Sequence, residues 1–250
     1  MENIIEVEKL KKNFGNFTAV NEITFRIKKG EIFGFLGPNG AGKSTTIRIL
    51  CGLLIPTSGK AAVSGFDVYR QSEKIKQNIG YMSQKFSLYY DLTVEENINF
   101  YSGIYKVKRK DKNMRKKEVL DLINLSHLRK SLTASLPVGF KQRLALGCAV
   151  LHDPPIIFLD EPTSGVDPIS RNNFWNLINS LSDEGKTIFI TTHYLAEAEY
   201  CDRIALIYDG NIIALDSPRE LKKTYAARFG IKSPTLEDIF MTSIEDYKNA

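Results

Sequence analysis

The sequence contains few cysteines, no long hydrophobic run and no repeated or low-complexity segment. Its three cysteines, Cys51, Cys148 and Cys201, are odd in number and far apart. We therefore expect buried thiols in a reducing compartment, and neither a disulfide framework nor a C-x-x-C metal site. No run of about eighteen apolar residues occurs, which excludes a transmembrane helix. The polar, acidic start Met1-Glu2-Asn3 argues against a secretory signal.

The overall composition is that of an ordinary globular protein. Of the 250 residues, 43% are hydrophobic and 25% are charged, which excludes a disordered or collagen-like chain. This length suits one domain, alone or with a subdomain, and is ample for burying a core. The 34 basic and 29 acidic residues give a net charge of +5, a mild excess that does not demand a nucleic-acid partner.

Strand-like and helix-like segments alternate along most of the chain. Residues 156–159 and 187–190 are continuous apolar runs, as expected for strands that are buried on both faces of a sheet. This alternation predicts an α/β fold with a partly parallel sheet. Other predicted strands span 4–7, 19–27, 31–36, 79–82, 204–208 and 212–215, with the hairpin signal Asp209-Gly210 between the last two; predicted helices span 44–51 and 172–181.

The pattern changes between residues 84 and 151, where strand signals disappear. Residues 93–105, 112–125 and 141–151 predict helices, which we interpret as a helical insertion into the α/β core. Within this insertion, residues 106–117 hold eight Lys or Arg in twelve positions. Such a run usually forms a solvated helix face and loop; the alternative is a contact with anionic lipid headgroups or with a partner.

A glycine-rich motif follows the predicted strand 31–36 and precedes a predicted helix. Its glycines let backbone N–H groups converge on phosphate oxygens, and the helix N-terminus adds a positive dipole. We expect Lys43 to reach the β- and γ-phosphates of a nucleotide and the Ser44 hydroxyl to ligate Mg²⁺. The motif matches G-x-x-x-x-G-K-[ST] and consists of Gly37, Pro38, Asn39, Gly40, Ala41, Gly42, Lys43, Ser44 and Thr45.

Two acidic residues end the buried run 156–159. Asp160 and Glu161 are consecutive, and successive side chains of a strand diverge, so the two carboxylates can serve different purposes. Asp160 is expected to act on Mg²⁺ through the water shell of the ion. Glu161 is expected to polarise the attacking water as a general base. The alternative, an acidic helix cap, fits less well because a strand precedes both residues.

Taken in order, these motifs resemble those of the ATP-binding subunits of ABC transporters, over residues 3–216. The phosphate loop alone is shared by many ATPases and GTPases, whereas the ordered set is highly specific. The resemblance implies an α/β P-loop ATPase core of the ABC type, with an antiparallel β portion at the N-terminus and an inserted helical subdomain. It places the core at 1–84 and 152–216, the helical subdomain at 85–151 and a C-terminal helical tail at 217–250.

The resemblance also implies roles for single residues, with ATP and Mg²⁺ as cofactors. Phe14 occupies the position that stacks on adenine, although an edge-strand aromatic would look the same. Gln84 corresponds to the glutamine that senses Mg²⁺ and joins the core to the helical subdomain; a solvated loop amide is the alternative. Asp167 corresponds to the aspartate that communicates between two cassettes, and it is also a good helix start. His193 corresponds to the histidine that contacts the γ-phosphate.

The signature region departs from the family pattern. Where the family has Leu-Ser-Gly-Gly-Gln, this chain has Leu136-Pro137-Val138-Gly139-Phe140. The serine hydroxyl is absent, and Pro137 also lacks a backbone N–H. In the family this loop caps the γ-phosphate of ATP on the opposite subunit. We hypothesise that the cap survives here on backbone N–H groups such as that of Gly139, on the helix dipole and on Ser135, with weaker ATP-driven closure.

The resemblance implies two kinds of partner. One phosphate loop in the chain means that a second cassette must complete each ATP site, and a two-fold homodimer is the simplest arrangement. Export needs a separate membrane permease, which would hold the chain at the inner face of the cell membrane. Its docking point is expected near the apolar residues of segment 85–91, which could instead fill the helical subdomain. No nucleic-acid partner is expected.

The type of cassette resembles the subfamily that serves efflux permeases for drugs, sodium or polysaccharides. Segments 34–39 and 163–168 and the tail 233–240 carry this likeness, which does not name the cargo. Two alternatives stay open. A cassette ATPase acting on ribosomes or DNA would generally have two cassettes or long inserted coils in one chain. A non-hydrolysing nucleotide-binding module would not need Lys43, Asp160, Glu161 and His193 together.

Overall fold

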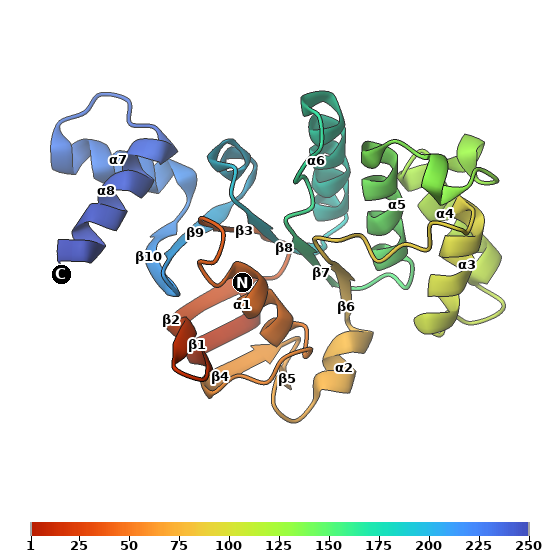
Figure 1. Cartoon of the computed structure of the whole chain (residues 1–250), viewed down its shortest axis with the longest axis horizontal. Helices are drawn as coiled ribbons and strands as arrows, with labels where there is room; N and C mark the ends of the chain where they lie inside the picture. Colours follow the sequence, from red (N-terminus) through yellow and green to blue (C-terminus); the bar gives the residue numbers. More distant parts are fainter. Residues whose placement is uncertain (1, 250) are drawn as a thin grey trace.

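A six-stranded sheet runs through the centre of the molecule in the computed structural model, which describes residues 2–249 (Figure 1). Its strand order is β10-β9-β3-β8-β7-β6, with all neighbours parallel except the antiparallel pair β9 and β10. The predicted α/β class with a partly parallel sheet is therefore confirmed. The strands are β3 (Ile32–Leu36), β6 (Ile79–Met82), β7 (Ile156–Asp160), β8 (Thr187–Thr192), β9 (Arg203–Tyr208) and β10 (Asn211–Asp216).

A second, antiparallel sheet packs below the first in Figure 1 and confirms the predicted N-terminal β portion. Its order is β2-β1-β4-β5, with β1 (Asn3–Phe14), β2 (Phe17–Lys28), β4 (Ser58–Val63) and β5 (Phe66–Asp67). The strand predicted at 4–7 is thus too short. Lys9 has a φ of +47°, and the pairing shifts register between Val7 and Leu10. Leu10 is buried as a result, and the alternating pattern that would reveal the rest of β1 is broken.

Three helices begin where a polar side chain caps them. Thr93 and Glu96 form a reciprocal capping box at α3, and Asp167 and Ser217 cap α6 and α7, each followed by proline. The caps explain why α6 begins four residues before the predicted 172. The helices are α1 (Lys43–Leu50), α2 (Ser72–Gln77), α3 (Val94–Ile104), α4 (Lys112–Leu122), α5 (Val138–Val150), α6 (Pro168–Asp183), α7 (Pro218–Phe229) and α8 (Leu236–Asn249), with short 3₁₀ turns at Ser126–Leu128, Thr133–Ser135 and Leu195–Tyr200.

Several predicted boundaries were wrong. Helix α5 starts at Val138 and not at 141, and α4 ends three residues before the predicted 125, next to Asn124, which has a φ of +53°. Strands β4 and β5 and helix α2 had no prediction, because their small and polar residues carry little periodic signal. The tail has the two expected helices, but α8 spans 14 residues and is not short.

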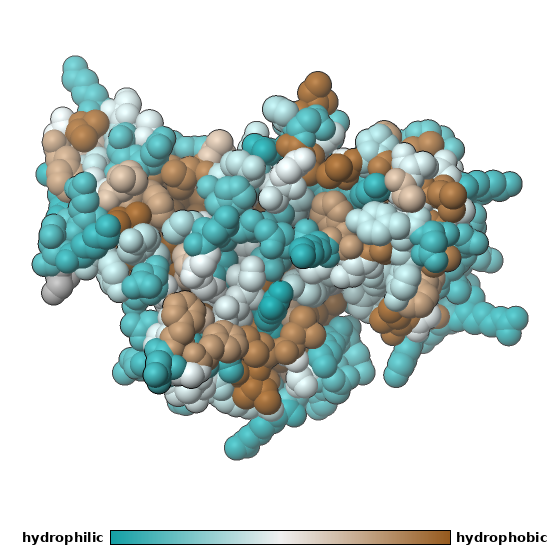
Figure 2. Space-filling view, viewed as in Figure 1, coloured by the Kyte–Doolittle hydropathy of each residue, from teal (hydrophilic) through white to brown (hydrophobic). Residues whose placement is uncertain are grey.

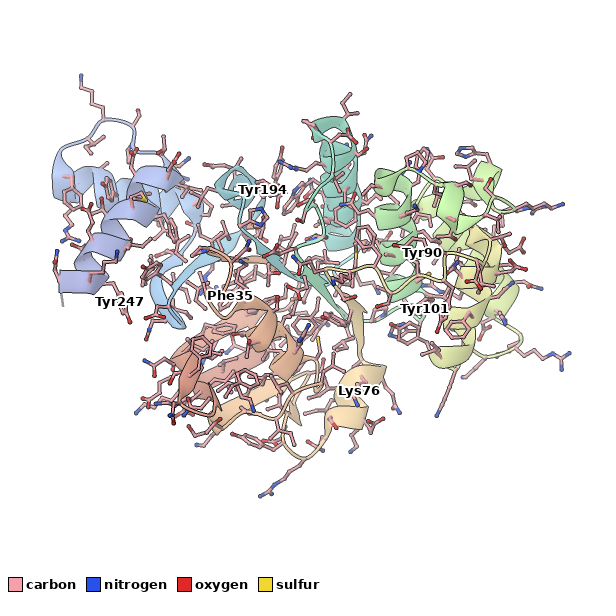
Figure 3. The ribbon with its side chains drawn as sticks, in the orientation of Figure 1. Phe35, Lys76, Tyr90, Tyr101, Tyr194 and Tyr247 are labelled. Carbon is pink, nitrogen blue, oxygen red and sulfur yellow. The ribbon has the colours of Figure 1, made fainter. Side chains whose placement is uncertain are left out.

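The central sheet has a hydrophobic core on each face. Phe33 and Phe35 of β3 belong to the core shared with the antiparallel sheet and α1, whereas Ile32 and Leu36 belong to the core shared with α5, α6 and the other helices. Alternation along the strand therefore divides its side chains between the two faces. Figure 3 shows Phe35 at the centre of the molecule. The three cysteines are buried and unpaired, as predicted.

Helices α3, α4 and α5 gather at one end of the central sheet, and α7 and α8 gather at the other (Figure 1). Lys108, Arg109 and Lys110, in the turn between α3 and α4, are exposed. Figure 2 shows long hydrophilic side chains extending from this end of the molecule. The exposure suits a solvated face; contact with lipid headgroups stays a prediction. A search of residues 2–249 found no helix with the length and hydropathy needed to span a membrane.

His152 joins the helical group to the central sheet. Its ring stacks on Tyr105, with 3.8 Å between ring centroids, and its Nε2 lies 3.0 Å from the carbonyl oxygen of Ile79 in β6. Nδ1 is buried and lacks a hydrogen-bond partner among the described residues. Burial is the main cause that lowers the pKa of His152 to about 4. The neutral imidazole therefore suits this contact, and protonation opposes it.

The lowered pKa of His152 predicts a loss of stability in acid. A depressed pKa favours the folded protein above the ordinary histidine value and withdraws that contribution as pH falls through the folded value. Relative to His152→Gln, which does not titrate, the wild-type protein should lose up to about 2 kcal/mol of unfolding free energy between about pH 7 and pH 4, after allowance for solvent screening. Urea unfolding of both proteins at several pH values measures the difference. Parallel pH profiles would contradict the prediction.

Candidate functional site

The phosphate loop lies between β3 and α1 and has no space for larger residues at two of its glycines. A Cβ added to Gly37 would come within 2.2 Å of the Ile207 carbonyl oxygen, and one added to Gly42 within 2.3 Å of the Ala19 carbonyl oxygen. Gly42 also has a φ of +101°, which only glycine adopts without strain. These contacts position the N-terminus of α1, where the backbone N–H groups face the cleft.

Lys43, the first residue of α1, is held in a buried position. Its Nζ donates to the carbonyl oxygens of Gly37 at 2.8 Å and Pro38 at 3.0 Å, and lies 3.0 Å from Oε1 of Glu161. The side chains of Lys43 and Glu161 are only 3% and 6% exposed. A buried charge without a partner is strongly unfavourable, so each of these two residues holds the other in place.

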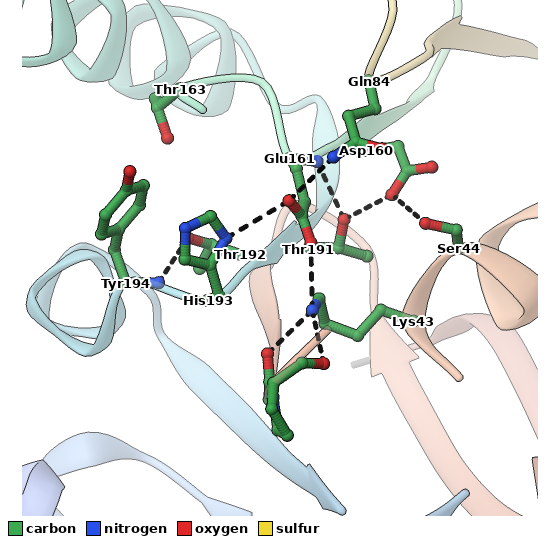
Figure 4. Close-up of polar contacts among 12 residues, drawn as sticks. Lys43, Ser44, Gln84, Asp160, Glu161, Thr163, Thr191, Thr192, His193 and Tyr194 are labelled. Atoms are coloured by element: carbon green, nitrogen blue, oxygen red, sulfur yellow. Dashed lines mark hydrogen bonds and ion pairs between the residues drawn. The ribbon is translucent and has the colours of Figure 1, made fainter. Parts of the chain in front are cut away.

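Glu161 has a second set of contacts through its other carboxylate oxygen. Oε2 accepts a hydrogen bond from Nε2 of Gln84 at 3.1 Å and lies 3.2 Å from Nδ1 of His193 (Figure 4). The backbone of Glu161 has a φ of +47°, which is uncommon for a residue with a side chain. Two bonds from its N–H to Thr191, at 2.9 Å to Oγ1 and 3.1 Å to the carbonyl, hold this conformation.

Asp160 turns to the other side of β7. Its Oδ1 accepts hydrogen bonds from the hydroxyls of Ser44 at 3.0 Å and Thr191 at 2.7 Å. Burial raises the pKa of Asp160, and these two hydrogen bonds partly offset the rise. The side chains of Asp160 and Glu161 therefore have different partners, and both lie at the carboxyl ends of parallel strands, where ligands bind in α/β folds.

A cleft of about 370 Å³ connects this cluster to the hairpin of β1 and β2. Phe14 and Phe17, which pair across the hairpin and are 49% and 58% exposed, form one wall. The phosphate loop with Lys43 and Ser44, together with Gln84 and Glu161, forms the other. The ammonium of Lys12 lies 5.0 Å from the ring centroid of Phe14. Phe17 was missed by sequence reasoning; its place across the turn from Phe14 is the signal that could have found it.

Two predicted site residues lie away from this cleft. Gly139, near the start of α5, is buried against α6: a Cβ added to it would lie 2.5 Å from the hydroxyl of Ser170. Oδ1 of Asp167 accepts from the backbone N–H of Ser170 at 2.9 Å, as a helix cap does. Within one chain, neither residue lines the cleft with Lys43. A role for either in nucleotide binding stays a prediction about a second chain.

Sequence reasoning also missed two residues that support the site. Thr191 in β8 bonds to both Asp160 and Glu161, but in sequence it resembles any threonine in a strand. Gln142 of α5 is fully buried, and its Nε2 donates to the carbonyl of Pro162 at 2.8 Å, directly after Glu161. A polar residue on the buried face of an apolar helix is the signal for Gln142, since buried polar groups are normally hydrogen-bonded.

Comparison with known proteins assigns the family. The family model described as ABC transporter matches residues 20–164, more than half of the chain. The chain belongs to the ABC transporter family. Escherichia coli YbhF, named a probable multidrug ABC transporter ATP-binding protein, is 50% identical over 246 residues, which cover 98% of this chain and 42% of YbhF. The linearmycin resistance ATP-binding protein LnrL of Bacillus subtilis is 39% identical over 219 residues, covering 87% of this chain and 70% of LnrL.

Solved structures agree with this assignment. A dimeric structure of the ATP-binding cassette MJ0796, in a post-hydrolysis state with ADP and Pi, superposes with a TM-score of 0.76 at 26% identity and covers 85% of this chain and 98% of that one. The predicted ABC-type ATPase fold is therefore confirmed. The chain spans about two fifths of the length of YbhF, so activity, cargo and partners of a whole protein do not pass directly to this ABC transporter chain.

The buried hydrogen bonds of the Thr191 hydroxyl predict that this group contributes to the stability of the folded protein. Thr191→Val removes a hydroxyl that donates to Asp160 and accepts from the N–H of Glu161. Because both groups are buried, the free energy of unfolding should fall by about 1–3 kcal/mol. Thr191→Ser keeps the hydroxyl and is the matched control, with an expected loss below about 1 kcal/mol. Urea unfolding followed by circular dichroism measures both variants. Equal losses in the two would contradict the role given to the hydroxyl.

Proposed function

We propose that this chain is the ATP-binding and ATP-hydrolysing subunit of an ABC exporter, which dimerises around two ATP molecules and drives export through a separate membrane permease. The observation that carries the proposal is the convergence of Lys43, Gln84 and His193 on the two oxygens of Glu161, at 3.0, 3.1 and 3.2 Å. Such a cluster of charge and hydrogen-bonding groups beside a phosphate loop suits nucleotide hydrolysis.

ATP would bind in the cleft between the aromatic wall and the phosphate loop. Adenine stacks on Phe14, which is exposed and available for such a contact. The β- and γ-phosphates take the place of the Gly37 and Pro38 carbonyls as partners of Lys43, and backbone N–H groups of residues 39–45, at the loop and the start of α1, bind their oxygens. Because the Lys43 ammonium already lies within the loop, binding requires only a local exchange of partners.

Ser44 and Asp160 fit a magnesium ion. Their oxygens are 3.0 Å apart, and oxygen donors beside nucleotide phosphates are what Mg²⁺ prefers. The Ser44 hydroxyl would ligate the ion directly, and Asp160 would hold its water shell, with Gln84 beside the γ-phosphate. When bound, Mg²⁺ neutralises charge on the β- and γ-phosphates. A cation there would also favour the ionised form of Asp160, whose pKa burial raises.

Hydrolysis follows from the position of Glu161. A water molecule held by Glu161 and His193 attacks the γ-phosphorus, and Glu161 accepts its proton. The bond between the γ-phosphorus and the β–γ bridging oxygen breaks, which yields ADP and inorganic phosphate. Lys43 stabilises the negative charge that develops on the phosphoryl oxygens during this step.

A second copy of the chain would complete each site. Gly139 and Asp167 lie outside the cleft of their own chain, as expected for residues that face the nucleotide of a partner. Helix α5 begins after Pro137, so the N–H groups of Val138 and Gly139 have no acceptor within the helix. The Ser135 hydroxyl donates to the Leu132 carbonyl at 2.8 Å, which leaves backbone groups as the main cap. The dimer of MJ0796 supports pairing of such cassettes.

The permease would dock beside Gln84, at the inner face of the cell membrane. Leu88 is 8% exposed and belongs to the hydrophobic core, and Phe86 packs against that core. Tyr89 and Tyr90 are instead 44% and 47% exposed, and Figure 3 shows Tyr90 beside the helical group. Some apolar residues of segment 85–91 therefore fill the core, and others form an aromatic surface suited to a partner. The multidrug and resistance names of YbhF and LnrL favour export.

Replacement of the proposed general base tests the activity. Glu161→Gln should retain ATP affinity within about threefold and lower turnover by ~10²–10⁴, because an amide cannot accept the proton. ATP-dependent dimerisation, followed by light scattering, should become stable in this variant. Glu184→Gln, an exposed acidic residue at the end of α6, is the control. Near-normal phosphate release by Glu161→Gln would refute the assignment.

The altered signature at Pro137 predicts weaker ATP-driven dimerisation than a serine at this position would give. In the Glu161→Gln background, Pro137→Ser should tighten ATP-driven dimerisation by about tenfold, since a hydroxyl donor to phosphate is restored. Pro137→Ala restores the backbone N–H without the hydroxyl and separates the two contributions. Sedimentation at several ATP concentrations measures the dimer. Unchanged or weaker dimerisation of the serine variant would show that the hypothesis of a weakened cap is wrong.

A further inference from the structure

A buried carboxylate lies outside the proposed catalytic cluster and contacts none of the residues Lys43, Gln84 and His193. Glu197, in the 3₁₀ turn after β8, is 1% exposed. Its Oε1 accepts a 2.6 Å hydrogen bond from the hydroxyl of Thr163, while its Oε2 is buried with no hydrogen-bond partner in the described part of the chain. Burial of an ionised group is costly unless the group is paired. A purely structural role would be served better by an apolar side chain.

Arg171 is the cationic partner of Glu197, but the two are not fully engaged. Nε of Arg171 lies 3.5 Å from Oε1 of Glu197, close enough for an ion pair but outside hydrogen-bond geometry, and this Nε is also buried without a hydrogen-bond partner among residues 2–249. A movement of a few tenths of an ångström would turn the contact into a charge-assisted hydrogen bond. A small displacement would therefore change how tightly the pair is engaged.

Both ends of this pair are tied to the loop that follows Glu161. Thr163 lies two residues after Glu161, and Arg171 lies in α6 directly beyond the loop. Nη2 of Arg171 donates to the carbonyl oxygen of Val166 at 3.4 Å, next to Asp167. A displacement of loop 162–167 would therefore move the Thr163 hydroxyl and the Arg171 guanidinium relative to Glu197.

The other side of the pair leads to His193. The guanidinium carbon of Arg171 lies 4.2 Å from the ring centroid of Tyr194, and that ring lies 4.1 Å from the ring of His193. The N–H of Glu197 donates to the carbonyl oxygen of Tyr194 at 3.0 Å. Figure 4 shows Thr163 and Tyr194 on the same side of the site as His193. Loop 162–167 and the turn that carries His193 are thus connected through the ion pair of the partly exposed Arg171 with the buried Glu197.

We propose that Glu197 and Arg171 are positioning residues: their ion pair, anchored by Thr163 and stacked on Tyr194, sets the position of His193 relative to Glu161 according to the position of loop 162–167. The proposal rests on the proposed ATPase function and deepens it. Neither residue touches the nucleotide or the reacting atoms; each acts through Tyr194 and the turn at His193. The partner cassette, in contact with Asp167, would control hydrolysis through this link.

Steady-state kinetics of matched glutamine variants test the proposal. Glu197→Gln should lower kcat by about tenfold or more while KM for ATP changes by less than about threefold, because the amide places a donor toward Arg171. Glu199→Gln, an exposed residue in the same turn, is the control and should keep wild-type kinetics. A Glu197→Gln enzyme with wild-type kcat, or with a loss confined to KM, would overturn the proposal.

A double-mutant cycle separates a link from two independent defects. If the pair acts as a unit, Arg171→Gln should lower kcat as Glu197→Gln does, and the double variant should lose no more than either single variant. Losses that multiply in the double variant would overturn the proposal. Arg171 is partly exposed, with 27% of its side chain accessible, so its variant also serves if Glu197→Gln fails to fold.

Proton NMR of His193 tests the link from the ion pair to His193 independently of ATP turnover. The chain has three histidines, so the imidazole proton resonances of His193 can be assigned with a His193→Ala variant. These resonances should move in Glu197→Gln and Arg171→Gln and stay unchanged in Glu199→Gln. Wild-type protein without ATP turnover would refute the proposed function alone, and the resonances would still decide the link. Unmoved His193 resonances in both pair variants would overturn it.

Discussion

The buried ion pair between Lys43 and Glu161 is the interaction on which the site depends. Lys43 begins α1 and Glu161 follows β7. The two residues are 118 positions apart in the chain, but their charged atoms lie 3.0 Å apart. Either charge alone at this depth would be costly unless another group, such as a bound phosphate, replaced its partner. The pair therefore holds the phosphate loop against the end of β7, and the uncommon backbone of Glu161 is maintained because Thr191 bonds to it twice.

The order of the parallel strands explains why these residues meet. Strands β3, β8, β7 and β6 are adjacent, and the phosphate loop, His193, Glu161 and Gln84 follow their carboxyl ends in the same order. Register adds the precision: Leu36 pairs with Thr192, and Asp160 pairs with Thr191. Loops from segments far apart in sequence are thereby brought within hydrogen-bond distance of one carboxylate.

The same geometry keeps two predicted site residues out of the cleft of their own chain. Gly139 and Asp167 meet at Ser170, where α5 packs on α6, while the cleft opens between the phosphate loop and the β1–β2 hairpin. The close approach of Gly139 to Ser170 leaves no space for a side chain, which explains a glycine at this position through packing alone. Gln142, which bonds to Pro162, connects the same helix α5 to the residue after Glu161, so movement of the helical group would reach the proposed general base.

Local patterns in the sequence were enough for the elements that carry the chemistry. The apolar runs of β7 and β8, the glycine motif before α1 and the hairpin signal Asp209-Gly210 each specify their structure within about ten residues, because backbone conformation and strand burial are local properties. Only the tertiary structure decided which polar and charged side chains contact one another. The bulge at Lys9, the two bonds of Thr191 and the burial of Glu197 depend on register and packing between distant segments, which no local pattern records.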